Sequence, residues 1–531
     1  MTQSSLTITG TSGRREIVDK QSDTPFSTVT ISDSDVPAPN LVVTVTLSDH
    51  TQGTLFNLGI GAYDPFAGVY LVSGTAAAVT VALDALVFTP TIAPGVTEST
   101  AFTISVDDGI VPPISDATTT VSVTSTVGGP NTVALTGAPG YAASLYDTGF
   151  YWDTVYGQSG TVFLTNAQAS VVGGGMHLIF QTYSSASLYE TSNNWDTVTG
   201  DSATLYLVTA QASVIGSYAH ISFNSASGNA VSLYDTSKGF DFVNGSDGDI
   251  TLINAQAIVT GGNNRIYFSG NGTFDAVNLF FTDGQWDIVF GSYGAVTVSH
   301  AQASVVGGGD TIYFAEYQTS DNKGEAVSLY QTNGAWDTVW NSNGIVILND
   351  AQASVLGGNE NIYFSISSEN EVSLYRTENA WDNIYGSNGT VTLNDSQTSI
   401  FGGGNYVYLN GGHLNAVSLY QTNGEADYVF GSNSAVILND AKAYVSGNGN
   451  DVYLNGFTNV LAFQPEIGQA TVHGFDYMDV LQFSKSDFAN FDTLHPVQVG
   501  TNTVIDFDGS NVVTLIDVIS SSLTAKQFSF V

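Results

Sequence analysis

The sequence predicts an all-β protein in which a β-sandwich is followed by a repetitive β-solenoid and a β-rich C-terminal cap. A block of about 45 residues recurs seven times between residues 141 and 463, and such a period is typical of solenoids, propellers and arrays. Apolar and polar residues alternate in short segments that end in turn residues, which indicates strands. Ten of the twelve prolines lie from Pro25 to Pro139, and none lies between residues 140 and 464. Because proline cannot donate to a strand ladder, that stretch is expected to be one continuous sheet system.

These observations divide the chain of 531 residues into four segments. We expect the sandwich over residues 1–126, a linker rich in Gly and Pro over 127–140, the seven repeats over 141–463 and the capping domain over 464–531. With 43% hydrophobic residues, the chain is long enough to build several buried cores.

The first segment contains four stretches with period-2 apolar faces, a pattern typical of an antiparallel sandwich. They are Leu41–Asp49, Gly68–Gly74, Ala85–Thr91 and Thr100–Gly109. Together with VTISDSDVPAPN before the first stretch, they resemble the bacterial cadherin-like, immunoglobulin-type modules that are common in large secreted surface proteins. The resemblance implies calcium binding, and the residues that match the calcium-binding turns are Asp33, Asp35, Asp107 and Asp108. The alternative is that these carboxylates only close turns by accepting bonds from their own backbone.

The seven repeats are spaced by 43 to 50 residues and begin near Ser144, Ser187, Ser232, Asn278, Ser328, Ser373 and Ser418. Each contains an internal echo: WDTVWNSNGIVIL (Trp336–Leu348) aligns with QASVLGGNENIYF (Gln352–Phe364). We expect each half of about 22 residues to form one coil of a β-solenoid. A seven-bladed β-propeller is the rival architecture, since seven units of about 45 residues would close such a ring.

One acidic position recurs in all seven repeats and usually follows a tryptophan. The acidic residues are Asp153, Asp196, Asp241, Asp287, Asp337, Asp382 and Asp427, and the tryptophans are Trp152, Trp195, Trp286, Trp336 and Trp381. The first interpretation is a ladder of stacked aromatic rings with Asp capping turn amides. The second is a row of Trp and Asp that grips sugar rings. A Gln position that recurs in six repeats predicts amide ladders along the stack.

The repeats resemble the glycine-rich nonapeptides of the RTX family, GGxGxDxUx, only in part. GGGDTIYF (Gly307–Phe314) is near this pattern, but most corresponding segments lack the Asp that would bind calcium. We therefore expect calcium in the solenoid only at scattered sites, with Asp310 and Asp451 as the candidate ligands.

The last segment resembles the C-terminal secretion domain of type I exported proteins related to the RTX family. The matching residues are MDVLQFSKSDFANFDTL (Met478–Leu494) and VQVGTNTVIDFDGSNVVTLIDVISSSLTAKQFSFV (Val497–Val531). The resemblance implies an uncleaved C-terminal signal, export through the type I secretion apparatus, and an extracellular or cell-surface location. The start of the chain lacks the basic and apolar regions of a Sec signal, which agrees with that expectation.

Composition limits the partners. The formal net charge is −38, from 48 acidic and ten basic residues, which argues against nucleic acid and favours a cation. Calcium is the expected ion, because it prefers carboxylate and carbonyl oxygens. The chain has no Cys, which removes disulfides and zinc–thiolate sites. No apolar stretch reaches the ~18–20 residues of a membrane span.

The sequence thus predicts a secreted bacterial structural protein that binds calcium and assembles head-to-tail with itself into a filament, surface layer or biofilm matrix. Solenoid ends are unpaired strand templates, which makes such assembly plausible. No catalytic motif is present, so we do not expect an enzyme. Two alternatives stay open: an adhesin that binds polysaccharide through the Trp and Asp positions, and a polysaccharide-modifying enzyme with paired carboxylates.

Overall fold

The computed structural model describes residues 6–19, 21–92, 96–125, 131–135, 142–224, 227–236, 238–269, 275–282, 284–315, 325–340, 343–365, 369–377, 380–411, 414–463 and 467–531. The chain divides into two compact units, residues 1–250 and 251–531. In the described residues, no helix is long and apolar enough to cross a membrane.

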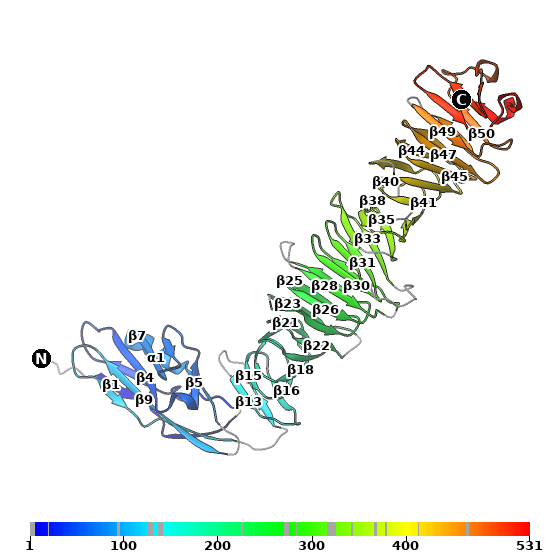
Figure 1. Cartoon of the computed structure of the whole chain (residues 1–531). Coiled ribbons are helices and arrows are strands. Elements are labelled where there is room, and N and C mark those ends of the chain that lie inside the picture. The colour runs from blue at the N-terminus through cyan, green and yellow to red at the C-terminus, as the bar shows by residue number, and fades with distance from the viewer. Residues whose placement is uncertain are drawn as a thin grey trace. The chain divides into compact units, whose positions relative to one another are not determined.

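The first unit opens with the predicted sandwich (Figure 1). Its main sheet has the strand order β2-β11-β9-β4-β7-β6, with β10 paired to β9, and smaller sheets are formed by β1 with β3 and by β5 with β8. The strands are β1 (Leu6–Thr9), β2 (Arg14–Val18), β3 (Thr30–Asp33), β4 (Leu41–Leu47), β5 (Gly53–Phe56), β6 (Ala62–Asp64), β7 (Val69–Gly74), β8 (Val87–Pro90), β9 (Thr97–Asp107), β10 (Ile114–Asp116) and β11 (Thr120–Thr124).

The sandwich core is mainly aliphatic and contains a cluster of three phenylalanines. The ring of Phe102 meets those of Phe26 and Phe88 edge-on at centroid distances of 5.3 and 5.0 Å, and all three side chains are fully buried. The four stretches predicted as strands are strands β4, β7, β8 and β9, because alternation places every second residue in this core.

The sandwich also contains a helix that the alternation did not predict, α1 (Ala76–Asp84), and a short 3-10 turn, η1 (His50–Gln52). Thr75 caps α1 by accepting a bond from the backbone N–H of Ala78 at 3.3 Å. Alanine and leucine favour helix, and Val79, Ala82 and Leu83 bury one side of it. In this segment, the helical spacing of those three residues decides the structure.

The rest of the first unit is a parallel β-roll in which successive strands alternate between two sheets. The even sheet contains β12 (Thr132–Ala134), β14 (Asp153–Tyr156), β16 (Gln168–Val172), β18 (Ser185–Tyr189), β20 (Thr204–Val208), β22 (His220–Phe223) and β24 (Asp241–Asn244). The odd sheet contains β13 (Ala142–Tyr146), β15 (Gly160–Thr165), β17 (Met176–Thr182), β19 (Asp196–Thr199), β21 (Gln211–Ile215), β23 (Ala230–Tyr234) and β25 (Asp249–Ile253). Strand β12 lies within the predicted linker and pairs with β14; residues 127–130 and 136–140 of that linker lie outside the described residues.

The second unit continues with the same alternation. Its even sheet contains β26 (Gln256–Thr260), β28 (Ala276–Phe280), β30 (Ala295–Ser299), β32 (Thr311–Phe314), β34 (Asp337–Trp340), β36 (Gln352–Leu356), β38 (Glu371–Tyr375), β40 (Thr390–Asn394), β42 (Tyr406–Asn410), β44 (Asp427–Gly431), β46 (Lys442–Ser446), β48 (Val460–Phe463) and β50 (Val480–Phe483). Its odd sheet contains β27 (Arg265–Phe268), β29 (Asp287–Phe290), β31 (Gln302–Val306), β33 (Ala326–Tyr330), β35 (Ile345–Asn349), β37 (Asn361–Phe364), β39 (Asp382–Tyr385), β41 (Gln397–Phe401), β43 (Ala416–Tyr420), β45 (Ala435–Asn439), β47 (Asn450–Asn455) and β49 (Gln469–His473).

The predicted β-solenoid is therefore confirmed, and the propeller is wrong. Parallel pairing between strands two apart in sequence requires stacked coils, whereas the blades of a propeller are separate sheets arranged around a channel.

The expected coil length is wrong, because one repeat makes two and a half coils. The repeat that begins at Ala326 holds five strands, β33 to β37, and the next repeat begins with β38. In the odd sheet, Ala326 lies beside Ile345 and Ile345 beside Asn361, so a coil takes fewer than 20 residues here. Five is an odd number, so consecutive repeats begin on opposite sheets.

The interior of the roll is filled by the inward residue of each pleat. Strand β35 is representative, because Val346 and Leu348 are fully buried while Ile345, Ile347 and Asn349 face outward. Each buried Val, Leu or Ile contributes ~1.5–3 kcal/mol relative to exposure. Strands β49 and β50 extend the two sheets beyond residue 463.

The C-terminal cap covers the ends of both sheets of the second unit. Strand β54 (Phe528–Phe530) pairs with β50, and β53 (Val512–Leu515) pairs with β49. Strands β52 (Asn502–Asp506) and β51 (Val497–Val499) then add to β53 in antiparallel order. The described cap also contains three 3-10 turns, η2 (Phe491–Thr493), η3 (Ser520–Ser522) and η4 (Ala525–Gln527).

Candidate metal centre

Three carboxylates converge at one place in the sandwich. Asp33 is the last residue of β3, Asp35 follows two residues later, and Asp108 comes directly after β9. One carboxylate oxygen from each residue lies within 4.8 Å of those of the other two. Folding thus brings together two turns that are more than 70 residues apart in the chain.

The local backbone fixes the direction of these side chains. Asp33 Oδ1 accepts a bond from Asp35 N at 2.9 Å, and Asp108 Oδ1 accepts bonds from Ile110 N and Val111 N at 2.8 and 2.9 Å. Such Asx turns hold a carboxylate while leaving its second oxygen available. Asp33 Oδ2 is enclosed and accepts no hydrogen bond from any described residue.

This donor set fits calcium. Three negative charges within 5 Å repel one another, and a divalent cation removes that cost. Calcium takes 6–8 oxygen ligands in flexible geometry, so carbonyl groups or water would have to complete the shell. Of the four predicted ligands, Asp33, Asp35 and Asp108 are brought together. Asp107 belongs to no group of three potential ligands among the described residues, and its Oδ1 accepts the N–H of Gly109 at 2.8 Å.

The two scattered ligands predicted in the repeats lie in different environments. Asp310 is only 1% exposed, and its Oδ1 accepts the N–H of Gly294 at 2.8 Å. Asp451 is exposed on β47, with its Oδ1 at 3.7 Å from Nε2 of His473. Neither belongs to a group of three potential ligands in the described part of the chain, and calcium binding at either residue stays a prediction.

The recurring Asp of the repeats lies inside the roll. All seven side chains are fully buried, and each occupies the first position of a strand, where its Oδ1 accepts a backbone N–H from the preceding coil. The pairs are Asp153 with Asn131, Asp196 with Met176, Asp241 with Ala219, Asp287 with Asn264, Asp337 with Asp310, Asp382 with Glu360 and Asp427 with Asn405, at 2.8–3.0 Å. The predicted capping of turn amides is therefore what the structure contains.

Burial raises the pKa of six of these carboxyls. It raises the pKa of Asp196, Asp241, Asp287 and Asp427 to about 7, against partial compensation by the backbone N–H bonds. In six of these carboxyls, those of Asp196, Asp241, Asp287, Asp337, Asp382 and Asp427, Oδ2 is buried without a hydrogen-bond partner. An unpartnered buried oxygen favours the neutral form.

In two repeats a second acid lies beside the recurring one. Burial, and then the charge of neighbouring Asp310, raise the pKa of Asp337 to about 8. Burial and the nearby Asp382 carboxyl raise the pKa of Glu360, a residue that is fully buried. Two adjacent buried carboxyls cannot both ionise without a large cost, so in each pair the neutral form of at least one carboxyl is favoured.

The expected single row of Trp and Asp is wrong for two reasons. The Asp side chains are enclosed, and the five-strand repeat places consecutive members on opposite sheets: Asp337 on β34 and Asp382 on β39, then Asp427 on β44. In one sheet, β34 and β44 are five strand spacings apart, about 24 Å at ~4.8 Å each. The tryptophans are each half-buried and directly precede the strands that begin with the recurring Asp: Trp152, Trp195, Trp286, Trp336 and Trp381.

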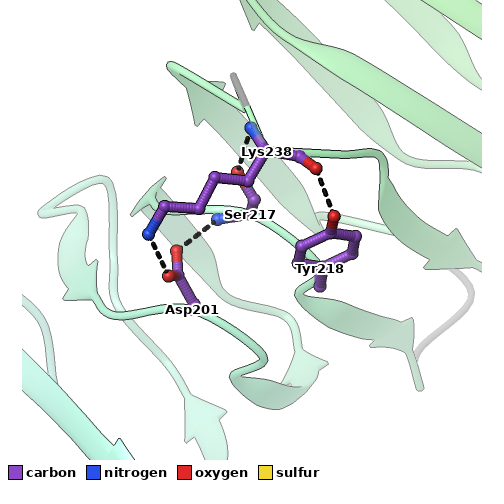
Figure 2. A network of polar contacts seen from close by, with 4 residues as sticks. All are labelled: Asp201, Ser217, Tyr218 and Lys238. Atoms are coloured by element: carbon purple, nitrogen blue, oxygen red, sulfur yellow. Dashed lines mark hydrogen bonds and ion pairs between the residues drawn. The ribbon is translucent and has the colours of Figure 1, made fainter.

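Figure 2 shows a polar network on the surface of the first unit that the sequence did not indicate. Lys238 Nζ lies 2.6 Å from Asp201 Oδ2, Ser217 N donates to Asp201 Oδ1 at 3.1 Å, and the Tyr218 hydroxyl donates to the Lys238 carbonyl. The bonds from Lys238 and Ser217 lower the pKa of Asp201. The lysine ammonium bonds a carboxylate and not the Ser217 hydroxyl, so this network fastens three turns and forms no Ser–Lys nucleophile.

A hollow of about 610 Å³ lies in the cap, lined by Gln498, Gly500, Thr501, Asp517, Ile519, Ser520 and Ser521. It contains one carboxylate, whereas glycoside hydrolysis ordinarily uses two on opposite sides of the bond.

Comparisons with known proteins place the chain in no family. No family model matches it, and no curated protein matches it. Among solved structures, the extracellular lipase LipA from Serratia marcescens matches with 13% sequence identity and a TM-score of 0.19, over 42% of this chain and 45% of the lipase. The match thus spans less than half of that enzyme, and at this TM-score it carries no argument about this chain.

Proposed function

We propose that the protein is a secreted bacterial structural protein that assembles with itself, in the presence of calcium, into an extracellular filament, surface layer or biofilm matrix. The observation that carries this proposal is that recurring polar side chains of the repeats accept hydrogen bonds from the backbone. The recurring Asp is enclosed and caps the backbone, and the recurring Thr does the same: Thr332 Oγ1, for example, accepts the N–H of Gln352 at 3.0 Å. Side chains that are committed to holding coils together support a mechanical role.

Calcium has its best-supported place in the sandwich. The group of Asp33, Asp35 and Asp108 joins the loop after β3 to the loop after β9. A cation there would stabilise the sandwich against the repulsion of its own carboxylates. In a calcium-rich extracellular medium, the ion would favour folding after export.

Export rests on the resemblance of residues 478–531 to type I secretion domains. Because this segment forms the cap, the proposed signal would also close the roll after export. Any head-to-tail contact would then involve the exposed strand β51, in which Val497 and Val499 are 58% and 56% exposed, rather than an open end of the roll.

The polysaccharide alternatives have weaker support. The Asp that would bind a sugar is enclosed, and consecutive tryptophans of the repeats precede strands of opposite sheets. Any polysaccharide would therefore have to contact separate sites.

The test is sedimentation velocity of the full-length protein with millimolar calcium or a chelator, together with negative-stain microscopy. We expect larger species in calcium and their loss in chelator. Asp33→Asn combined with Asp108→Asn should shift the calcium requirement to higher concentration, while Asp440→Asn, which changes an exposed acid outside the group, should not. A wild-type protein that stays monomeric at every protein and calcium concentration would contradict the proposal.

A further inference from the structure

One outer face of the second unit carries no charge. It consists of the outward-facing residues of β35, β37, β39, β41, β43 and β45 in the odd sheet, all of them described, and we call it the neutral face. The chain has a formal net charge of −38, yet the acidic side chain on these strands, that of Asp382, points inward. The corresponding strands of the even sheet, by contrast, present Glu371 and Lys442 outward.

An aromatic ladder lies along the neutral face. Tyr363, Tyr385, Phe401 and Tyr420 are neighbours in register on β37, β39, β41 and β43. Successive ring centroids are 4.9, 4.9 and 4.7 Å apart, and the ring planes differ by 12–16°. Because the rings stack on one another, their faces are covered and their edges point to solvent. A sugar needs a free ring face to stack on, so the ladder suits a flat protein surface better.

We propose that the neutral face binds the neutral face of a second copy of this chain; the inference rests on the self-assembly proposed above and assigns it a surface. A parallel sheet is normally covered on both sides, whereas the outward residues of this face are partly exposed in the described part of the chain. Two copies with the same large negative charge repel wherever their acidic turns meet. Contact through the neutral face avoids this electrostatic repulsion. Tyrosine and phenylalanine are also enriched in the cores of protein–protein interfaces.

The size of the face sets the strength of the contact. Five strand spacings of ~4.8 Å and strands of five residues at ~3.3 Å give a footprint of about 400 Å². A stable interface buries ~800 Å² per partner, so one contact pairs two chains weakly and reversibly. Pairing should therefore depend on protein concentration.

The experiment is sedimentation equilibrium of the full-length protein in calcium over two decades of concentration. Tyr385→Glu places a like charge at the centre of the face. Tyr406→Glu is the matched control: this residue lies on β42 of the even sheet, is 45% exposed, and also stacks on a neighbour, Tyr428, at 5.1 Å. We expect the mean mass of wild type and Tyr406→Glu to rise together with concentration, while the mean mass of Tyr385→Glu rises far less.

Tyr385→Thr keeps a good strand former and no charge, and we expect it to weaken pairing at least severalfold while the circular dichroism spectrum stays unchanged. Wild-type pairing with equal pairing of Tyr385→Glu would overturn the assignment of the surface and leave self-assembly standing. An equal loss of pairing in Tyr406→Glu would also overturn the assignment of the surface and leave self-assembly standing. A wild type that is monomeric throughout would overturn both proposals. Binding of a soluble polysaccharide by monomeric wild type, lost in Tyr385→Glu, would assign the face to a sugar polymer instead.

Discussion

Asp427 allows the effect of one buried carboxyl on the free energy of unfolding to be measured. Its side chain is fully buried in β44, and Oδ1 accepts bonds from Asn405 N and Asn405 Nδ2 at 2.9 and 3.1 Å. Burial raises its pKa from 3.8 to about 7, and the bonds from Asn405 offset only part of that rise. The folded protein therefore keeps this proton at a pH where the unfolded chain has released it.

The sign and size follow from proton linkage. Below pH ~4 both states are protonated, and the group has no pH-dependent effect. Between pH ~4 and ~7 the unfolded state binds fewer protons, so the free energy of unfolding falls by up to ~1.4 kcal/mol per pH unit for this carboxyl. Above pH ~7 the loss is complete, at an upper limit of about 4 kcal/mol. Asp196, Asp241 and Asp287, whose pKa burial also raises to about 7, add losses in the same direction, so these carboxyls favour the stability of the roll in mild acid.

The assay is urea unfolding followed by circular dichroism at pH 5 and pH 8, at constant calcium, for wild type and Asp427→Asn. The wild-type midpoint should fall at pH 8, and the variant should recover part of that fall because Asn does not titrate. Asp440→Asn is the control, since Asp440 is exposed and bonds from Phe457 N and Thr458 N lower its pKa; it should recover nothing. If Asp427→Asn lost as much stability between pH 5 and pH 8 as wild type, the reasoning would be refuted.

Three further changes test the interior. Glu360→Gln removes an acid beside Asp382 and should raise the urea midpoint at pH 8 with little effect at pH 5; an equal gain at both pH values would contradict the electrostatic cause. Ile362→Ala empties a fully buried position and should cost ~2–5 kcal/mol, measured by the same unfolding; a cost below 1 kcal/mol would mean that the interior is loosely packed. Gly308→Ala would place a Cβ 2.3–2.4 Å from the carbonyl oxygens of two residues in the next turn and should lower the thermal midpoint far more than Gly13→Ala, whose Cβ has nothing within 4 Å. Similar losses in both glycine variants would show that close approach of the backbone is not the cause.

The sequence missed the true coil because the repeat and the coil have different lengths. The 45-residue repeat is visible in the letters AVSLY, which recur at Ala326 and Ala416. The coil depends on which strand pairs with which, and strands of different sequence pair, as Val346 of β35 with Ile362 of β37. A division of the repeat into five segments of about nine residues, rather than two halves, was the signal that would have given the coil.

The sequence indicated the candidate ligands of the metal centre, but it did not show which of them lie close together. The resemblance indicated Asp33, Asp35, Asp107 and Asp108, and the structure unites three of them. Asp107 and Asp108 are adjacent in sequence, but neighbours in extended chain point to opposite sides, so only one of the two reaches the group.

By itself, the sequence determined that the chain is all-β, that the proline-free repeats form one continuous sheet system and that a sandwich precedes them, because alternation and proline content act locally on the strand. Only the tertiary structure decided that consecutive repeats begin on opposite sheets and that their aspartates are enclosed. It also decided that the outer face of β35 to β45 in the odd sheet is free of charge. The physical reason is the odd number of strands in each repeat. Equivalent residues of consecutive repeats therefore lie on opposite sheets, and the pleat of each strand then decides whether a side chain points inward or outward.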